Sequence, residues 1–381
     1  MQVYFDNAAT TPLEKDVIDT MLPFMQNHFG NPSAIHSRGR ETRAAIEKAR
    51  KTISKYLNCS PGEIFFTSGG TEANNTALRN GVKDLKIKHV ISSKIEHHCG
   101  LHTIEELEKE GLIAAHYVEV DKLGRFDLNQ LDGILSGLKE KCLVSLMHAN
   151  NEIGTKNNLE ELSAICEKYD AILHVDTVQT MAHYPMDLQK LKIHFLSAAA
   201  HKFHGPKGVG FLFIRSGLKI RPLIFGGAQE RNMRAGTENV YGIVGMAKAF
   251  EMAFENMKAN SEHIIQLKQY MIQELKLNFP EIMFNGDAEG DSLYTVLNVG
   301  FPMNDKNALL LFNLDINGIC ASSGSACSSG SDKGSHVLQA IGADKDRVAI
   351  RFSFSHFNTK EEIDFVISKL KELVIVAQPV L

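Results

Sequence analysis

Short runs rich in strand-forming residues alternate with longer amphipathic segments between residues 63 and 214. The runs, which are candidate strands, occupy residues 63–67, 89–92, 113–120, 142–147, 171–175, 195–199 and 209–214. Several intervening segments, such as 158–169, repeat apolar residues with the 3.6-residue period of a helix that packs on a core. Strands that alternate with helices predict an α/β domain with a mainly parallel, seven-stranded sheet covered by helices.

The second half of the chain has a different pattern. Residues 239–277 form a nearly uninterrupted helical pattern without proline, which we interpret as a bridge into a second domain. Beyond it, candidate strands at 294–299 and 348–354 alternate with candidate helices at 308–314 and 359–374, typical of a smaller α+β domain. A chain of 381 residues exceeds what one core usually supports. We expect a large domain at 16–257 and a small domain formed by 1–15 with 258–381.

Composition and charge indicate which classes of molecule this protein binds. The net charge of −4 gives no positive field that would attract a nucleic acid. No apolar run approaches the ~18 residues of a membrane span, and the charged Asp6 follows the first residues too closely for a signal peptide. The six cysteines include no Cys-x-x-Cys pair, so we expect reduced thiols. These features predict a cytoplasmic protein whose partners are small molecules or proteins.

Two residues that follow predicted strands suggest a cofactor. Asp176 ends one strand, and Lys202 lies 26 residues later between small residues and a Gly-Pro turn. Such a cramped, apolar setting favours a nucleophilic amine. Pyridoxal phosphate (PLP) needs a lysine to form an imine with its aldehyde and a carboxylate to face its pyridine nitrogen. The two residues together therefore predict a PLP site, although each alone has an ordinary structural reading.

Other polar residues also follow predicted strands, where ligands of parallel sheets gather. The stretch 67–74 contains Gly70 and Thr71 and opens a helix, so it is a candidate phosphate site, or else an ordinary strand-to-helix turn. Gln179 is placed to bond a ring oxygen, and His97 to stack on an aromatic ring or move protons. The histidines are not accompanied by a cysteine or carboxylate at ligand spacing, so we expect no metal site.

One thiol stands apart from the others. Cys327 lies in the Ser/Gly-rich stretch 321–331, which suggests an accessible and reactive position, whereas Cys320 follows an apolar segment and is expected in the core. Arg351 alternates with apolar neighbours on a predicted strand, and an inward-facing guanidinium there suits the carboxylate of an amino acid. A reactive lysine together with an accessible thiol suggests sulfur transfer.

Nearly the whole chain resembles the cysteine desulfurases, PLP enzymes of the class-V aminotransferase group with fold type I. The resemblance rests on the order and spacing of residues 4–12, 29–32, 67–72, 96–97, 149–154, 174–179, 201–202, 205–208, 234–237 and 322–327. The long loop that contains Cys327 is similar to that of the NifS/IscS-type group.

The resemblance implies a role for each matched residue. Lys202 would bind PLP covalently, and Asp176 would pair with its pyridine nitrogen. Contacts to the ring would come from His97, Asn151 and Gln179, and contacts to the phosphate from Gly70, Thr71, His201 and, in a homodimer, Thr237 of the partner subunit. Asn31 and Arg351 would hold the substrate carboxylate.

The implied reaction converts L-cysteine to L-alanine. The PLP ring delocalises the electrons left when the α-proton is removed, with Lys202 and His97 as proton carriers, and the Cys327 thiolate takes the sulfur as a persulfide. An acceptor protein, either an iron–sulfur scaffold or a tRNA-thiolation enzyme, would then receive it. The alternatives are a selenocysteine lyase, another class-V aminotransferase, and a sulfur carrier that lacks PLP.

Two departures from the family pattern stand out. The family usually has a serine that bonds the phosphate where this chain has Ala199, and Ser197 lies ~7 Å away along the strand, too far to replace it. We therefore expect weaker PLP retention. The chain also ends at Leu381, soon after its last predicted helix, which disfavours docking to an iron–sulfur scaffold.

Overall fold

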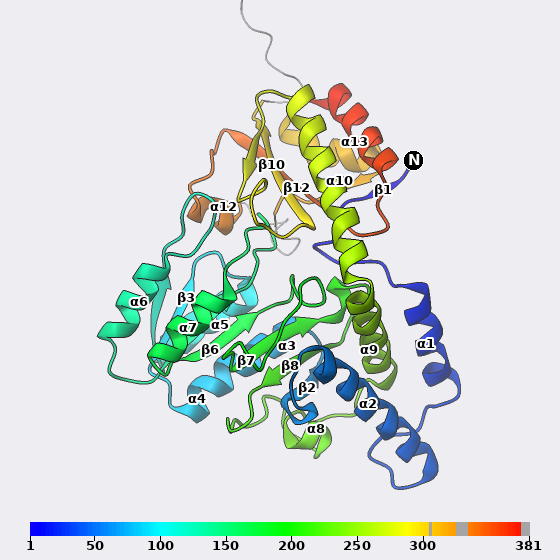
Figure 1. The fold of residues 1–381 in the computed structure, drawn as a ribbon, viewed down its shortest axis with the longest axis vertical. Helices are drawn as coiled ribbons and strands as arrows, with labels where there is room; N and C mark the ends of the chain where they lie inside the picture. The colour runs from blue at the N-terminus through cyan, green and yellow to red at the C-terminus, as the bar shows by residue number, and fades with distance from the viewer. Residues whose placement is uncertain (305–306, 325–333, 375–381) are drawn as a thin grey trace, which may run out of the picture.

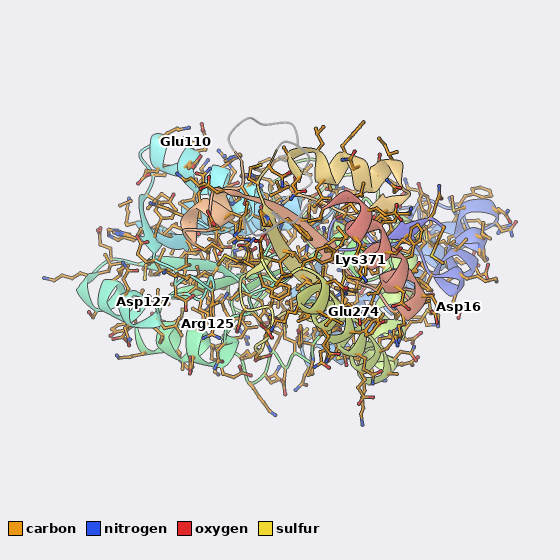
Figure 2. All side chains as sticks on the ribbon, turned by 90° about the horizontal axis from the view of Figure 1, so that it is seen from above. Asp16, Glu110, Arg125, Asp127, Glu274 and Lys371 are labelled. Carbon is orange, nitrogen blue, oxygen red and sulfur yellow. The ribbon has the colours of Figure 1, made fainter. Side chains whose placement is uncertain are left out.

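The computed structural model describes residues 1–304, 307–324 and 334–374. Two lobes are joined by a pair of consecutive helices (Figure 1). The lower lobe contains the largest sheet with helices on both faces, and the upper lobe contains the smaller sheets and the N-terminus. Charged side chains, among them Asp16, Glu110 and Asp127, lie at the periphery on different sides of the molecule (Figure 2).

The large sheet has seven strands in the order β2-β8-β7-β6-β5-β3-β4. They are β2 (Ile64–Thr67), β3 (His89–Ser93), β4 (Ala114–Val118), β5 (Cys142–Met147), β6 (Ile172–Asp176), β7 (Phe195–Ala199) and β8 (Gly210–Ile214). Strand β8 is antiparallel to both of its neighbours, and the other pairs are parallel. This confirms the predicted mainly parallel, seven-stranded sheet.

Two hydrophobic cores cover the two faces of this sheet. Phe211 and Phe213 of β8 point into one core, and Leu212 between them points into the other, as expected for alternating side chains. The first core is closed by α1 (Lys15–Gln26), α2 (Ser37–Tyr56), α6 (Leu128–Gly137), α7 (Leu159–Lys168) and α9 (Val240–Glu255). The second is closed by α3 (Gly70–Asn75), a π-helical turn (Thr76–Asn80), α4 (Gly81–Leu85) and α5 (His98–Lys109). The large lobe is therefore a three-layer α/β structure.

The upper lobe is α+β. Its three-stranded antiparallel sheet has the order β12 (Arg347–Ser353), β10 (Val296–Pro302), β9 (Met283–Asn285), and β1 (Val3–Tyr4) pairs with β11 (Ile319–Cys320) beside it. These elements share a core with α10 (Met257–Asn278), α11 (Leu310–Ile316) and α13 (Lys360–Leu373). Two further short α-helices of the described residues are α8 (Gln229–Asn232) and α12 (His336–Ala340).

The helical bridge is interrupted, in contrast to the nearly continuous pattern of the sequence. Helix α9 ends with Asn256 as its C-cap, and α10 begins at Met257. Phe250 on α9 packs in the core of the large lobe, whereas Ile264 on α10 packs in the core of the small one. This change of core supports a division near residue 257, and the exact division into 16–257 and 1–15 with 258–381 stays a proposal.

The N-terminal segment crosses from the small lobe to the edge of the large sheet. After β1, Asp6 pairs with Ser353 at the end of β12, and the backbone N–H of Ala8 donates to the Ser353 hydroxyl at 2.8 Å. The N–H of Thr11 then donates to the carbonyl of His201 at 2.9 Å, just beyond β7. Residues far apart in the sequence therefore meet at the carboxyl ends of the strands.

Candidate active site

A cavity of about 220 Å³ lies where the carboxyl ends of the large-sheet strands meet the N-terminal segment and β12. Nine of the residues that the sequence singled out line it together: Gly70, Thr71, His97, Asn151, Asp176, Gln179, His201, Lys202 and Arg351. They come from separate loops and strand ends, and parallel pairing brings these ends to one edge. The predicted convergence of these residues is found in the structure.

Asp176 ends β6 with both carboxylate oxygens held by donors. Oδ1 accepts the backbone N–H of Val178 at 2.9 Å, and Oδ2 accepts Nδ2 of Asn74 at 2.6 Å. The two donors fix the position of the carboxylate, which suits pairing with a protonated nitrogen in the cavity.

Asn74 is in turn held by a buried histidine. Nε2 of His174 lies 3.1 Å from Oδ1 of Asn74, and Nδ1 lies 2.8 Å from the hydroxyl of Ser145. Burial lowers the pKa of His174 to about 4, so the ring is neutral. Since Asn74 uses its amide hydrogens toward Asp176, its oxygen accepts from His174, which assigns the ring proton to Nε2. A chain of donors therefore runs from Ser145 through His174 and Asn74 to Asp176.

Lys202 follows β7 in the short 3₁₀ turn η3 (Ala200–Lys202) and faces the same cavity. Its Nζ donates to the carbonyls of Ala8 at 2.5 Å and Ala9 at 2.8 Å. Gln179 donates from Nε2 to the same Ala8 carbonyl at 3.0 Å. The N-terminal segment thus forms the wall against which the lysine amine is placed.

His97 caps the first turn of α5 at another side of the cavity. Its Nδ1 accepts the backbone N–H of Cys99 at 3.2 Å. Burial lowers the pKa of His97, so the ring is neutral and its proton is assigned to Nε2. Cys99 itself lines the cavity, and burial raises the pKa of its thiol to about 12. A thiol in this state is a poor nucleophile.

The turn before α3 forms a cradle for an anion. Gly69 has a φ of 153°, and a Cβ placed on Gly70 would lie only 2.6 Å from Cγ2 of Val178, so side chains are excluded there. The N–H groups of the first helical turn have no partner within the helix and attract negative charge. His201 lies beside this turn in the cavity lining, with its Nδ1 3.2 Å from the hydroxyl of Thr10.

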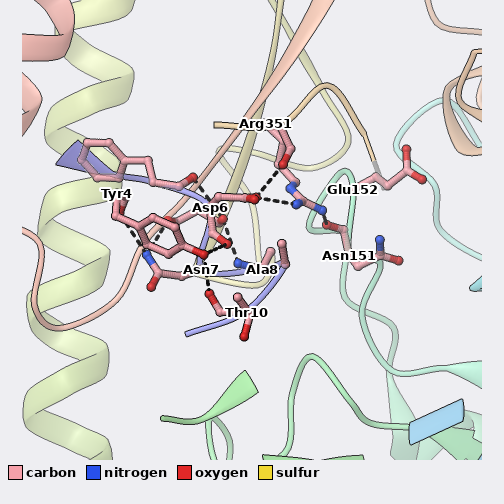
Figure 3. Close-up of polar contacts among 12 residues, drawn as sticks. Tyr4, Asp6, Asn7, Ala8, Thr10, Asn151, Glu152 and Arg351 are labelled. Atoms are coloured by element: carbon pink, nitrogen blue, oxygen red, sulfur yellow. Dashed lines mark hydrogen bonds and ion pairs between the residues drawn. The ribbon is translucent and has the colours of Figure 1, made fainter. Parts of the chain in front are cut away.

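Arg351 enters the cavity from β12 and is almost fully buried, with 1% of its surface exposed. It donates to the carbonyl of Asn151 at 2.9 Å and to the carboxylate of Asp6 at 2.8 Å, as Figure 3 shows. Among the described residues its Nε has no hydrogen-bond partner. A buried donor without a partner at the cavity wall suits the carboxylate of a substrate.

These residues fit PLP. The carboxylate of Asp176 suits a pyridinium, the glycine turn suits a phosphate, and Lys202 lines the same cavity. Ala199 also lines the cavity close to Gly70, in the place where the family usually has a serine. Ser197 does not compensate, because it does not line the cavity and its hydroxyl lies 3.1 Å from Nε2 of His174.

Several predicted residues lie elsewhere. Asn31 and Thr237 are exposed and do not line the cavity, so their roles stay predictions. Cys327 lies outside the described residues. The prediction that Cys320 is in the core is wrong: Ile319 beside it is buried, and alternation on β11 turns Cys320 to the surface.

Sequence reasoning missed Asn74, Cys99 and His174 as parts of the site. Asn74 and His174 lie within stretches already singled out, 67–74 and 174–179, but nothing local indicated that they contact each other. Within the described part of the chain, no group of three His, Cys, Asp or Glu residues is arranged to hold a metal ion. No helix in that part is long and apolar enough to cross a membrane.

Fold and site together define a PLP-dependent enzyme of fold type I. The class-V aminotransferase family model matches residues 3–366. A protein named cysteine desulfurase IscS from Dictyoglomus turgidum is 45% identical over 98% of this chain and 94% of its own length. A putative cysteine desulfurase IscS 1 from Bacillus subtilis is 41% identical over 98% of each chain.

Solved structures agree with these relatives. A NifS-like protein superposes with a TM-score of 0.90 at 39% identity, covering 98% of this chain and 99% of the other. A structure described as SspA in complex with cysteine gives a TM-score of 0.81 at 31% identity, covering 94% of this chain and 100% of the other. The chain therefore belongs to the cysteine desulfurases of the class-V aminotransferase family.

Proposed function

We propose that this enzyme takes sulfur from L-cysteine and carries it as a persulfide on Cys327. The cavity that joins Lys202, Asp176 and Arg351 supports this proposal most strongly, because it combines an amine, a partner for a pyridinium and a partner for a carboxylate. Bound PLP supplies an electron-accepting ring next to the α-carbon of the amino acid. The structural neighbour described as a complex with cysteine supports the choice of substrate.

Each residue of the site has a separate role in the proposed reaction. Arg351 binds the substrate carboxylate, and Lys202 removes the α-proton and returns a proton to carbon. His97, with its proton on Nε2, is placed to donate toward the cavity. The Cys327 thiolate attacks the substrate sulfur, an S–S bond forms, and the C–S electron pair stays on carbon, which takes up a proton. L-Cysteine and the thiol thus give L-alanine and a persulfide, with no external oxidant.

We further propose a cytoplasmic homodimer in which Thr237 of the partner subunit joins the phosphate site. Reduced, scattered cysteines fit a reducing compartment. The sulfur acceptor is proposed to be a protein of iron–sulfur assembly or tRNA thiolation, in line with the IscS names of the relatives.

Mass spectrometry after brief exposure to L-cysteine tests the proposal. We expect one added sulfur on the peptide that contains Cys327 and none on the peptide that contains Cys99, whose buried thiol stays protonated. Cys327→Ala should abolish sulfide release while the cysteine-induced colour change remains. Sulfide release that persists in this variant would contradict the role of Cys327 and favour another class-V reaction.

A further inference from the structure

Glu152 is a buried carboxylate beside the cavity that the reaction described above does not use. It directly follows Asn151 and has 1% of its surface exposed. Its backbone N–H donates to Oδ1 of Asn150 at 2.8 Å, and its carbonyl accepts Nδ2 of Asn298 at 3.0 Å. Figure 3 shows its side chain directed away from Arg351 and Asp6. Hydrogen bonds to its N–H and to its carbonyl therefore fix the backbone of Glu152.

The carboxylate lies between Gly324 and Ser335, which are at or next to the described ends of the segment that contains Cys327. The Ser335 hydroxyl donates to Oε2 of Glu152 at 2.5 Å. A Cβ placed on Gly324 would lie 3.1 Å from the same oxygen and 3.7 Å from Cβ of Ser335. Gly324 and Ser335 are therefore neighbours in space, with Oε2 of Glu152 against both. Oε1 is also buried and has no hydrogen-bond partner among the described residues.

Each end is also attached to a second residue of the site. Before Gly324, the Ser322 hydroxyl donates to Asp6 at 2.6 Å, and Asp6 pairs with Arg351. After Ser335, Nε2 of His336 lies 2.9 Å from the carbonyl of Glu96, next to His97. Of the residues named in these contacts, Glu152 is the one that lies against both Gly324 and Ser335.

We propose that Glu152 is a positioning residue: it holds Gly324 and Ser335 together next to Asn151 of the cavity lining, and so fixes the residues on either side of the Cys327 segment. The inference rests on the proposed function of Cys327. The rate of sulfur transfer depends on how the reacting groups are placed, and a displacement of about 1 Å between them costs on the order of 10²-fold in rate. Glu152 would thus act on the sulfur-transfer step and not on substrate binding.

The experiment separates these two steps in the PLP-loaded enzyme. The absorbance change on adding L-cysteine reports substrate binding, and quenched mass spectrometry reports sulfur on Cys327. We expect Glu152→Ala and Ser335→Ala to slow sulfur loading by roughly 10-fold to 100-fold while the absorbance change keeps its rate and cysteine dependence. Glu152→Gln, whose amide oxygen still accepts from Ser335, should restore most of the loading rate.

Thr359→Ala is the matched control. Ser335 and Thr359 both cap the start of a helix, α12 and α13, so both variants lose a cap, but only Ser335 contacts Glu152. The control should load sulfur at the wild-type rate. If Glu152→Ala does not fold, Ser335→Ala takes its place: it should load sulfur slowly, and Glu152→Gln should load sulfur at close to the wild-type rate.

Two results would overturn the proposal: unchanged sulfur loading in both Glu152→Ala and Ser335→Ala, or a loss of the absorbance change in parallel with loading. The second result would mean that Glu152 supports Asn151 and the cavity wall. A wild-type enzyme that shows the absorbance change but never places sulfur on Cys327 would overturn the proposed function itself, and this inference with it.

Discussion

Position 199 is where this site departs from the family pattern. Ala199 is buried at the end of β7 and lines the cavity beside the glycine turn of α3. It presents a methyl group where a hydroxyl would reach a phosphate. Ser197, the other hydroxyl on this strand, is fully buried beside Nε2 of His174 and does not line the cavity. The site therefore lacks this hydroxyl donor, and no other residue of β7 replaces it.

Ala199→Ser should tighten PLP binding. A hydrogen bond to a charged group contributes about 1.5–3 kcal/mol, which corresponds to a decrease in Kd of roughly 10-fold or more. Titration of the apoenzyme with PLP, followed by absorbance, measures this change. An unchanged Kd would show that the phosphate does not lie next to residue 199.

Glu96 is a fully buried carboxyl group under the site, and it should make stability depend on pH. Its Oε1 accepts the N–H of Met147 at 3.0 Å and the hydroxyl of Ser93 at 3.1 Å. Burial nevertheless raises the pKa of Glu96 from 4.5 to about 8. The folded protein keeps this proton where the unfolded chain has released it, so its contribution to stability is complete below pH 4.5 and is lost as the pH rises toward 8.

Glu96→Gln keeps the accepting oxygen and removes the titration. The free energy of unfolding of the wild type, minus that of the variant, should therefore fall steadily between pH 4.5 and about 8. Urea unfolding of both proteins at several pH values measures it, and other titrating groups cancel in the difference. A difference that does not change with pH would mean that Glu96 is not buried as a neutral acid.

At the scale of elements, the pairing register of three strands builds the support of Asp176. Ser145 on β5 lies opposite His174 on β6, and Asp176 lies opposite Ser197 on β7. Helix α3 adds Asn74, which connects His174 to Asp176. A shift of one residue in either register would turn these side chains to the other face of the sheet.

Asn74→Ala should weaken PLP binding by roughly 10-fold or more, because the carboxylate that faces the ring nitrogen loses a donor worth about 1.5–3 kcal/mol. Asn74→Asp should be worse, since it places a second carboxylate beside Asp176. PLP titration followed by absorbance measures both variants. Asn75→Ala is the control, because Asn75 bonds the carbonyl of Thr71 and the hydroxyl of Thr103 and makes no hydrogen bond to Asp176. Equal affinity in all four proteins would remove Asn74 from the cofactor site.

At the scale of the whole molecule, the cavity needs three distant parts of the chain. The large sheet supplies Asp176 and Lys202, β12 of the small lobe supplies Arg351, and the N-terminal segment joins them through Asp6 and Ala8. Thr237, expected to serve a neighbouring subunit, lies on the surface. The site is therefore assembled by the complete fold and, in our proposal, by a second copy of it.

Subunit mixing tests the shared site. Neither Lys202→Ala nor Thr237→Ala homodimers contain a complete site, but each mixed dimer contains one site with Lys202 from one chain and Thr237 from the other. We expect cysteine desulfurase activity at limiting PLP to rise when the two variants exchange subunits. Absence of any gain after exchange, verified by mass spectrometry of the dimers, would contradict a role for Thr237 across the interface.

The sequence by itself determined the fold class, the strands of the large sheet and, together with the family resemblance, nine of the residues that line the cavity. It did so because apolar periodicity is local and because a lysine and a carboxylate after strands have few chemical uses together. Only the tertiary structure decided that Asn74 and His174 support Asp176, and that Glu152 meets both Gly324 and Ser335. The tertiary structure also places Cys320 at the surface. These facts depend on strand register and on contacts between segments as distant as Asp6 and Arg351, which no local pattern encodes.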